Sequence, residues 1–363
     1  GGPLLRHSGA WSQAGNATVG GIDEPRDIRL GWTPESLSHW RELGSPITTG
    51  RVSRLDRGWS SVLVSLDELP VRVRNIGADV AVGDFVVFGA DEERVEHVLD
   101  RHSAFVRRAS FEGNRAEAHT IAANIDVVML LHGLTSPPNQ RRLERELVLA
   151  WDSGARPVVV LTKVDLVDDP APTLAALHDV APGVDILVAS GITGDGVEVL
   201  RGYAASNATI ALLGASGVGK STLVNSLVRH GRMITAEVRE GDQRGRHTTT
   251  ASELIRLVEG GWLIDTPGVR AVSLWSSGRG IENAFADVFE LMDHCRFRDC
   301  KHDNEPDCAV SAAVADGRLD PKRLDSMKRL VAEEAALEAE QRAQEKALDK
   351  RGVRKPRAVP GRH

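Results

Sequence analysis

The sequence predicts a multi-domain protein in which a small β-rich region precedes a central α/β region and a mostly helical C-terminal region. Three observations lead to this prediction. Short β-rich runs separated by Gly-containing turns fill residues 48–111. From about residue 122 the pattern becomes strand, helix, strand, which is typical of a mostly parallel sheet covered on both faces. Beyond residue 290, cysteines and histidine cluster ahead of a long stretch rich in Ala, Glu, Lys and Arg.

Length and composition limit the possible classes of protein. At 363 residues the chain is long enough for several domains, and its 41% apolar content supports real cores. No apolar run reaches the roughly eighteen residues that a membrane span requires, and the N-terminus shows no secretory pattern. Its 3 cysteines suit a reducing compartment, and a net charge of −6 argues against a generic nucleic-acid binder. We therefore expect a cytoplasmic protein without a membrane partner.

The N-terminal third divides into two parts. Residues 1–44, rich in Gly, Ser and charge, are expected to form an extension or loosely ordered arm. Runs such as residues 61–66, 71–74 and 84–88 predict a small barrel or sandwich. Its basic and aromatic residues form either a nucleic-acid surface or a solvated face around one core tryptophan, and both interpretations stay open. These residues are Arg51, Arg54, Arg57, Arg72, Arg74 and Trp59.

The central region shows the alternation of a doubly covered sheet. A buried strand is expected at residues 125–131, followed by an amphipathic helix at 139–152 with Leu143, Leu147 and Trp151 on one face. Gly154 is the expected stop of that helix. The remaining predicted elements are a strand ending at Thr162, a helix at 172–180, a strand at 184–190, a helix at 196–205, a strand at 209–213, and a hairpin of 253–259 with 261–265.

Residues 214–221 form a complete phosphate loop of the pattern G-x-x-x-x-G-K-(S/T) between a predicted strand and helix. Backbone N–H groups of such a loop surround a phosphate, and the positive end of the helix dipole points at it. Lys220 is expected to reach the β- and γ-phosphates, and the Ser221 hydroxyl to hold Mg²⁺. The predicted nucleotide contacts of this segment are Gly214, Ala215, Ser216, Gly217, Val218, Gly219, Lys220, Ser221 and Thr222.

A guanine-reading motif precedes the phosphate loop. In Thr162-Lys163-Val164-Asp165, the Asp165 carboxylate can accept hydrogen bonds from guanine N1–H and N2–H₂, a donor pair that adenine lacks. This argues against the competing class, a phosphate-loop ATPase or kinase. Ser190, in the loop after the strand at 184–190, is the third element of the base site. Thr162 stands where phosphate-loop GTPases usually have Asn, so we expect reduced guanine affinity with discrimination preserved.

Downstream lies Asp265-Thr266-Pro267-Gly268. Asp265 is expected to support Mg²⁺, and the Gly268 N–H to sense the γ-phosphate. Between the phosphate loop and this motif, one of the neighbouring threonines Thr248 and Thr249 should contact Mg²⁺. In most phosphate-loop GTPases the phosphate loop comes before the guanine motif, so here the order is rotated.

The catalytic residue is less directly indicated. Val269 follows Gly268 where many relatives have the Gln that orients water, so intrinsic hydrolysis should be slow. His247 is the best substitute, because a neutral imidazole can position water. A mobile loop histidine without a catalytic role is the competing interpretation.

Cys295, Cys300, His302 and Cys308 combine thiolates with an imidazole in one short segment. Such a set of four suits tetrahedral zinc without an open position, and therefore one structural zinc per chain. His294 is an alternative to His302 as the fourth ligand. Residues 321–351 predict a solvated helix, and residues 350–363 a basic arm.

The rotated motif order and the cysteine–histidine cluster closely resemble the bacterial ribosome small-subunit-dependent GTPase A family over about residues 46–310. The resemblance implies an OB-fold barrel, a circularly permuted GTPase domain, a zinc domain, catalysis by His247, and GTP hydrolysis stimulated by the small ribosomal subunit. It implies binding of GTP, GDP and the subunit's rRNA by a monomer. The alternative is a guanine-nucleotide switch acting on a non-ribosomal protein. The expected divisions are an extension at 1–45, the OB-fold barrel at 46–112, the GTPase domain at 120–280, the zinc domain at 281–349 and a basic tail at 350–363.

Overall fold

The structure is a computed structural model that describes residues 24–89, 94–108, 118–228, 252–265, 279–303 and 305–350. Within these ranges, no helix is long and apolar enough to cross a membrane.

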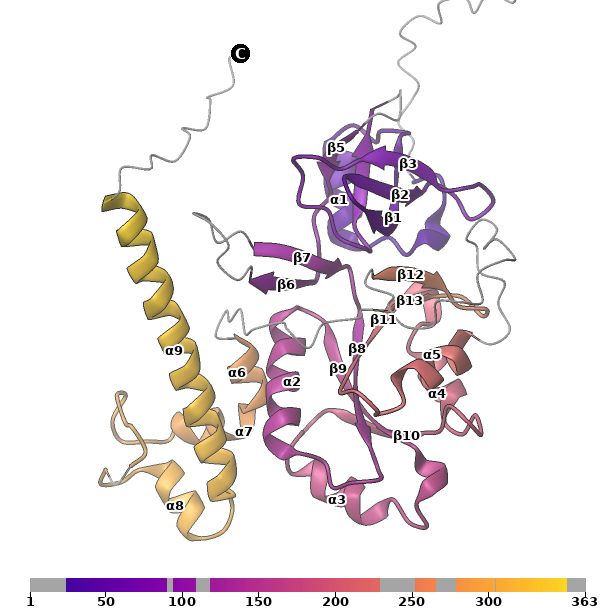
Figure 1. Ribbon diagram of the computed structural model, residues 1–363. Helices are drawn as coiled ribbons and strands as arrows, with labels where there is room; N and C mark the ends of the chain where they lie inside the picture. The colour runs from indigo at the N-terminus through magenta and orange to yellow at the C-terminus, as the bar shows by residue number, and fades with distance from the viewer. Residues whose placement is uncertain are drawn as a thin grey trace, which may run out of the picture.

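The central region is a parallel sheet with helices on both faces (Figure 1). Five parallel strands lie in the order β10–β9–β8–β11–β13, and β12 adds antiparallel to β13 at one side. Their consecutive buried Val, Ile and Leu residues reflect a sheet covered on both faces. The strands are β8 Val127–Gly133, β9 Arg156–Thr162, β10 Asp185–Ala189, β11 Thr209–Gly214, β12 Glu253–Arg256 and β13 Trp262–Asp265.

Alternate residues of the strands pack into two separate cores. Val128 and Leu130 of β8 belong to the core that α2 and α3 cover, whereas Met129 and Leu131 belong to the core of α4 and α5. This alternation follows from the two-residue period of a strand. The helices are α2 Gln140–Asp152, α3 Ala171–His178, α4 Val197–Gly202 and α5 Lys220–Val228, with short 3₁₀ turns η2 Val164–Leu166 and η3 Ala205–Asn207. The strand–helix alternation predicted from the sequence is confirmed.

The N-terminal strands pair in the order β3–β2–β1–β4–β5 around a small valine-rich core. One isolated parallel bridge, between Arg74 and Arg94, joins the two ends of this order, so the sheet is not closed by a ladder. The expected OB-fold barrel is therefore not confirmed. β1 also pairs with β12 through Arg54 and Glu253, which makes one continuous sheet of both regions. The strands are β1 Thr49–Asp56, β2 Trp59–Leu63, β3 Val71–Arg74, β4 Phe85–Phe88 and β5 Val95–Val98.

The segment before these strands corrects the expectation of a loosely ordered arm at residues 24–44. It forms a 3₁₀ turn, η1 Ile28–Leu30, and a helix, α1 Pro34–Glu42. The side chain of Thr33 caps α1, and Pro34 occupies its first turn. Trp40 is only 2% exposed, so apolar burial holds the helix in place. Residues 1–23 lie outside the described residues.

Arg51 requires a second correction, because it is fully buried and not part of a surface. Its guanidinium donates to the carbonyl oxygens of Leu30, Gly83 and Asn124 and to Thr209 Oγ1. Trp59, in contrast, is not a core residue. It is half-buried, with the guanidinium carbons of Arg72 and Arg74 at 4.9 and 5.1 Å from its ring centroid.

The C-terminal helices are α6 Arg279–Ala284, α7 Ala286–Met292, α8 Ala309–Ala315 and α9 Pro321–Lys350. Of these, α6 and α9 pack against α2, and α7 packs against α6 and α8. A separate hairpin of β6 Ala104–Arg108 and β7 Ala118–Ala123 lies near the N-terminal strands (Figure 1). Arg323 anchors the start of α9: its buried guanidinium pairs with Asp287 at 2.6 Å and donates to the carbonyl oxygens of Val180 and Ala284. The helix expected at 321–351 is confirmed over residues 321–350, but its first turns are packed rather than solvated.

Candidate nucleotide site and metal cluster

The predicted nucleotide motifs meet at one edge of the sheet. Thr162 ends β9, Gly214 ends β11 and Asp265 ends β13, and these strands run parallel. The carboxyl ends of parallel strands lie at the same edge, where open α/β sheets bind their ligands.

The phosphate loop connects β11 to α5, and two of its glycines have left-handed backbone conformations. Gly217 and Gly219 have φ values of +79° and +98°, which residues with a side chain rarely adopt. A Cβ on Gly214 would lie 2.9 Å from the Cβ of Leu131, so the strand end also requires glycine. The helix begins at Lys220, and Ser221 and Thr222 are exposed in its first turn. This geometry leaves the helix N-terminus open to an anion.

Lys220 and Asp265 are in direct contact. The Lys220 ammonium lies 2.8 Å from Asp265 Oδ1, and both side chains are partly exposed. The structure therefore brings the expected phosphate-binding cation beside the expected magnesium-supporting carboxylate. Thr248, Thr249, His247 and Gly268 lie outside the described residues.

On the base side, Thr162 ties β9 to the phosphate loop. The hydroxyl of this buried residue contacts the carbonyl oxygen of Val218 and lies 3.3 Å from that of His132. Lys163 follows in the left-handed region at φ 64°, and its stem would touch a Cβ on Gly219 at 3.9 Å. The turn leaves Asp165 exposed within η2, next to Val164. The structure thus places both motifs side by side although about fifty residues separate them.

The loop after β10 completes this side. Ser190 is fully buried, and its Oγ accepts hydrogen bonds from the N–H groups of Ile192 and Thr193 at 3.2 and 3.1 Å. A Cβ on Gly191 would lie 2.8 Å from the backbone carbon of Thr222. The loop can therefore lie against the first turn of α5 only because residue 191 has no side chain.

A group that the sequence did not indicate lies beside the phosphate loop. A cavity of about 220 Å³ separates loop residues 215–218 from the segment after β8. Arg142 lines it and binds Glu146 Oε1 at 2.7 and 2.8 Å, while His132 contacts the other carboxylate oxygen at 2.9 Å. No sequence pattern identifies Glu146 as part of this site, because its position is compatible with the polar side of an amphipathic helix.

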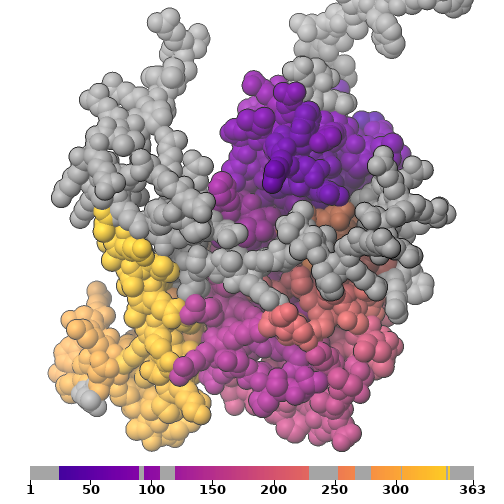
Figure 2. Space-filling model, viewed as in Figure 1, coloured from indigo at the N-terminus to yellow at the C-terminus, as the bar shows by residue number. Residues whose placement is uncertain are grey.

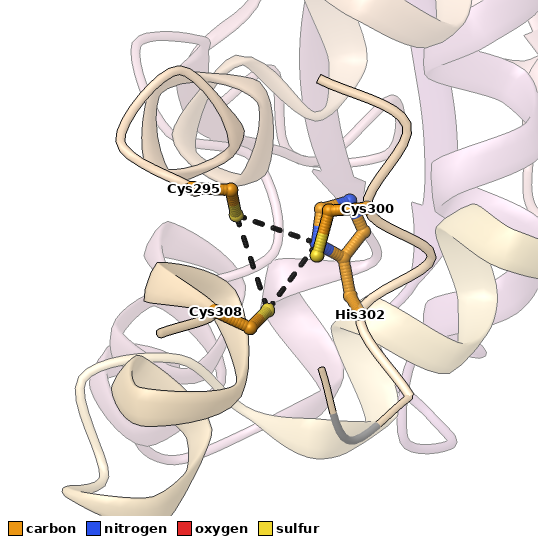
Figure 3. Close-up of side chains that lie close together, drawn as sticks. All are labelled: Cys295, Cys300, His302 and Cys308. Carbon is orange, nitrogen blue, oxygen red and sulfur yellow. Dashed lines mark hydrogen bonds between the residues drawn. The ribbon is translucent and has the colours of Figure 1, made fainter. Parts of the chain in front are cut away.

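The predicted metal ligands converge in the C-terminal region (Figure 3). The ligand atoms of Cys295, Cys300, His302 and Cys308 all lie within 4.8 Å of one another. Three of the separations are 3.5, 3.6 and 3.9 Å. A tetrahedron with zinc–ligand bonds of about 2.0–2.3 Å has edges of roughly 3.5–3.8 Å, so the set fits a structural zinc ion. His294 is exposed and lies outside this set.

Local contacts shape the cluster for a metal. Burial opposes ionisation of the Cys308 thiol, but hydrogen bonds from Ser311 outweigh it and lower the pKa of Cys308 to about 6. A thiolate is the form that binds metal. His302 occupies the left-handed region at φ 57°, and Lys328 of α9 donates to its carbonyl oxygen at 3.0 Å.

Together, the sheet order β12–β13–β11–β8–β9–β10 and a guanine-type loop that precedes the phosphate loop define a circularly permuted phosphate-loop GTPase. A model of the family described as RsgA GTPase matches residues 98–275. The chain belongs to this family and is a GTP hydrolase.

Curated relatives support the assignment over most of the chain. A protein of Streptomyces coelicolor, named small ribosomal subunit biogenesis GTPase RsgA, is 40% identical over 329 residues, covering 85% of this chain and 87% of the relative. A protein of the same name from Methanosarcina acetivorans is 36% identical, covering 91% of this chain and 90% of the relative.

Solved structures support the fold. YloQ, described as a circularly permuted GTPase, is 26% identical with a TM-score of 0.57, covering 79% of this chain and 95% of YloQ. YjeQ from Thermotoga maritima is 24% identical with a TM-score of 0.59, covering 79% of this chain and 98% of YjeQ.

Proposed function

We propose that this GTPase binds the small ribosomal subunit, assists its late maturation, and hydrolyses GTP to GDP and phosphate under stimulation by the subunit. The observation that carries the proposal is the 40% identity, over 85% of the chain, with a relative named for small-subunit biogenesis. The geometry of the phosphate loop supports binding of the nucleotide, and the basic surface around Trp59 supports binding of the subunit.

In this proposal the nucleotide lies along the sheet edge with its phosphates on residues 214–219. Lys220 neutralises the β- and γ-phosphates, and Asp165 selects guanine with help from the Ser190 loop. The Lys220–Asp265 contact of 2.8 Å supports this placement, because the same two groups would flank the phosphates and Mg²⁺. The magnesium ligands are Ser221, one of Thr248 and Thr249, and, in a supporting position, Asp265.

Catalysis is assigned to His247, which positions the attacking water in place of the usual Gln. Phosphoryl transfer relies on positioning and electrostatic stabilisation, so a partner that orders this segment raises turnover strongly. Gly268 reports the γ-phosphate to the C-terminal region, and one zinc ion holds the cysteine–histidine cluster there.

The RNA-facing surfaces are proposed to include the N-terminal strands and the basic tail at residues 350–363. The strand order β3–β2–β1–β4–β5 supports an OB-type arrangement. Trp59, with the guanidinium carbons of Arg72 and Arg74 at 4.9 and 5.1 Å from its ring centroid, supports an aromatic and basic surface for an unpaired base. We propose a cytoplasmic monomer that engages the rRNA of the subunit.

The test is GTP turnover by the purified protein alone, with small subunits, and with large subunits as the control. Stimulation of at least tenfold by small subunits alone is the expected result. Slow hydrolysis that neither subunit stimulates would favour the alternative, a guanine-nucleotide switch with a non-ribosomal protein partner.

A further inference from the structure

A groove of about 410 Å³ lies between α2 and α9, where the central region meets the C-terminal helices. In Figure 2 the yellow surface that contains α9 lies against the magenta surface that contains α2. The charged residues that line the groove are Arg141, Arg142, Arg145, Arg329 and Glu333. The whole chain carries a net charge of −6, so these arginines reverse the sign of the charge locally.

Carboxylates hold two of the α2 arginines in place. Glu146, which is 8% exposed, binds the Nε and Nη2 atoms of Arg142 through one oxygen. Glu333 of α9 pairs with Arg145 at 2.5 Å across the groove. A guanidinium carries five N–H donors in a fixed fork, so each of these pairs leaves further donors available. An arginine already held by a carboxylate loses less side-chain entropy when it binds a second anion.

The other two arginines differ in their partners. Arg329 pairs with Asp325 one turn earlier on α9. Arg141 is exposed and, among the residues that the structure describes, forms no ion pair. The groove therefore offers one uncommitted guanidinium and three that are pre-arranged.

We propose that this groove docks the phosphodiester backbone of small-subunit RNA, an inference that rests on the proposed function. Guanidiniums recognise phosphate oxygens in a bidentate manner, and backbone phosphates dominate the affinity of proteins for nucleic acids. Apart from the charged residues, the lining consists of Asn139, Ser326 and Leu330. Leu330 is only 4% exposed, so the groove lacks the apolar pocket that anchors a protein partner.

The groove also borders the nucleotide site. Asn139 and Arg142 line both the groove and the cavity beside Ser216 and Gly217 of the phosphate loop. The Asn139 side chain caps α2 by accepting from the Arg142 N–H at 3.1 Å. RNA bound in the groove therefore contacts the first turn of α2, which faces the phosphate loop. Binding of the RNA in the groove and stimulation of GTP turnover by the subunit occur together.

The first test measures the affinity of Arg141→Ala, and of Arg141→Ala combined with Arg145→Ala, for purified small subunits at several salt concentrations. Arg342→Ala is the matched control, because Arg342 lies on α9 outside the groove and pairs with Glu338 one turn away, as Arg329 does with Asp325. The double variant is expected to bind about tenfold more weakly, with the slope of log K against log salt reduced by about one for each arginine removed. Intrinsic GTP turnover and the control should be unchanged.

Wild-type binding to small subunits tests the proposed function, whereas the ratio of variant to wild-type affinity tests the groove. Equal affinities and equal salt slopes for wild type and double variant would overturn the groove assignment while leaving the proposed function intact. A second measurement replaces Arg141 by a photo-crosslinking amino acid and irradiates the complex. Nuclease-sensitive products are expected, and products sensitive only to protease would show that a protein occupies the groove instead.

Discussion

Thr162 shows how one side chain joins the base site to the phosphate site. Its hydroxyl contacts the carbonyl oxygen of Val218 in the phosphate loop, a contact that bridges motifs far apart in the chain. A hydroxyl has a single donor hydrogen, whereas the amide of the usual Asn offers two donor hydrogens and an acceptor, which is the physical reason for expecting weaker guanine binding.

Thr162→Val keeps the shape of this side chain and removes the hydroxyl. Losing one buried hydrogen bond costs about 1 kcal/mol, so GDP affinity should fall roughly fivefold, as measured with a fluorescent GDP analogue. Thr162→Ser restores the hydroxyl and should bind within about twofold of wild type by the same measure. Equal affinities for the Val and Ser variants would show that the hydrogen bond from this hydroxyl to the Val218 carbonyl oxygen does not contribute to GDP binding.

His247 tests catalysis separately from binding. His247→Ala should lower subunit-stimulated turnover by at least about a hundredfold, the usual contribution of a positioned general base, with GTP affinity nearly unchanged. Single-turnover hydrolysis with saturating small subunits is the suitable measurement. A stimulated rate like that of wild type would assign the water-positioning role to another group.

Among the structural elements, the short motifs are the most predictable from the sequence. The phosphate loop, the guanine loop at 162–165 and the hairpin ending at Asp265 are specified by local backbone chemistry, so sequence was sufficient to place them. Helix α1 was missed although Thr33 and Pro34 form a recognisable helix start. The polar, Gly-rich composition around it outweighed that local signal.

Other features depend on contacts that no local pattern encodes. Arg51 was considered as a surface residue because alternating basic residues on strands usually face solvent. Its burial depends on Thr209, which lies 158 residues away, and on carbonyl groups at the region boundary. The burial of Glu146 and Arg323 likewise arises from helix packing, which a single sequence does not reveal.

Asp126, which directly precedes β8, forms a pH-dependent ion pair with His102. Burial opposes the charge of His102, but the hydrogen bond and charge of Asp126 outweigh it and raise the pKa of His102 above its ordinary value of 6.5. Protonated His102 therefore stabilises the fold below about pH 6.5, and the contribution is lost as pH rises through the folded-state pKa.

His102→Gln should consequently be less stable than wild type at pH 6, with a difference that shrinks as pH rises above about 6.5. Urea unfolding at several pH values measures this difference. His119→Gln, an exposed histidine on β7, is the control and should show no such trend. A gap that stays constant from pH 6 to pH 8 would contradict the linkage.

The cysteine–histidine cluster is the element whose stability should depend on metal. Helix α8 spans only 7 residues, too few to be stable without the cluster that precedes it. Cys295→Ser should bind no zinc and should lose hydrogen-exchange protection over residues 295–315, whereas α9 stays anchored by Arg323. Elemental analysis should find one zinc per wild-type chain and per His294→Ala chain. Zinc retained at full occupancy in Cys295→Ser would contradict the ligand set.

One continuous sheet runs through the N-terminal and central regions of the molecule. β1 pairs with β12, and Arg51 of β1 donates to groups from three other segments. Its guanidinium also lies 5.7 Å from the ring of Trp262 in β13, the strand that ends at Asp265. These contacts connect the N-terminal strands directly to the strand that carries the magnesium-supporting carboxylate.

Arg51→Met should uncouple the two regions. The substitution leaves buried carbonyl oxygens without a donor, which costs about 3 kcal/mol or more and weakens the boundary most. In wild type, urea unfolding followed by tryptophan fluorescence, to which Trp32 and Trp40 contribute, should coincide with release of a bound GDP analogue. In the variant, the fluorescence change should come at lower urea than GDP release. Arg57→Met removes an exposed arginine directly after the same strand and should keep both transitions together. Coincident transitions in Arg51→Met would mean that contacts other than the Arg51 guanidinium, such as the hydrogen bond from Trp262 to the Arg29 carbonyl oxygen, are sufficient to join the two regions.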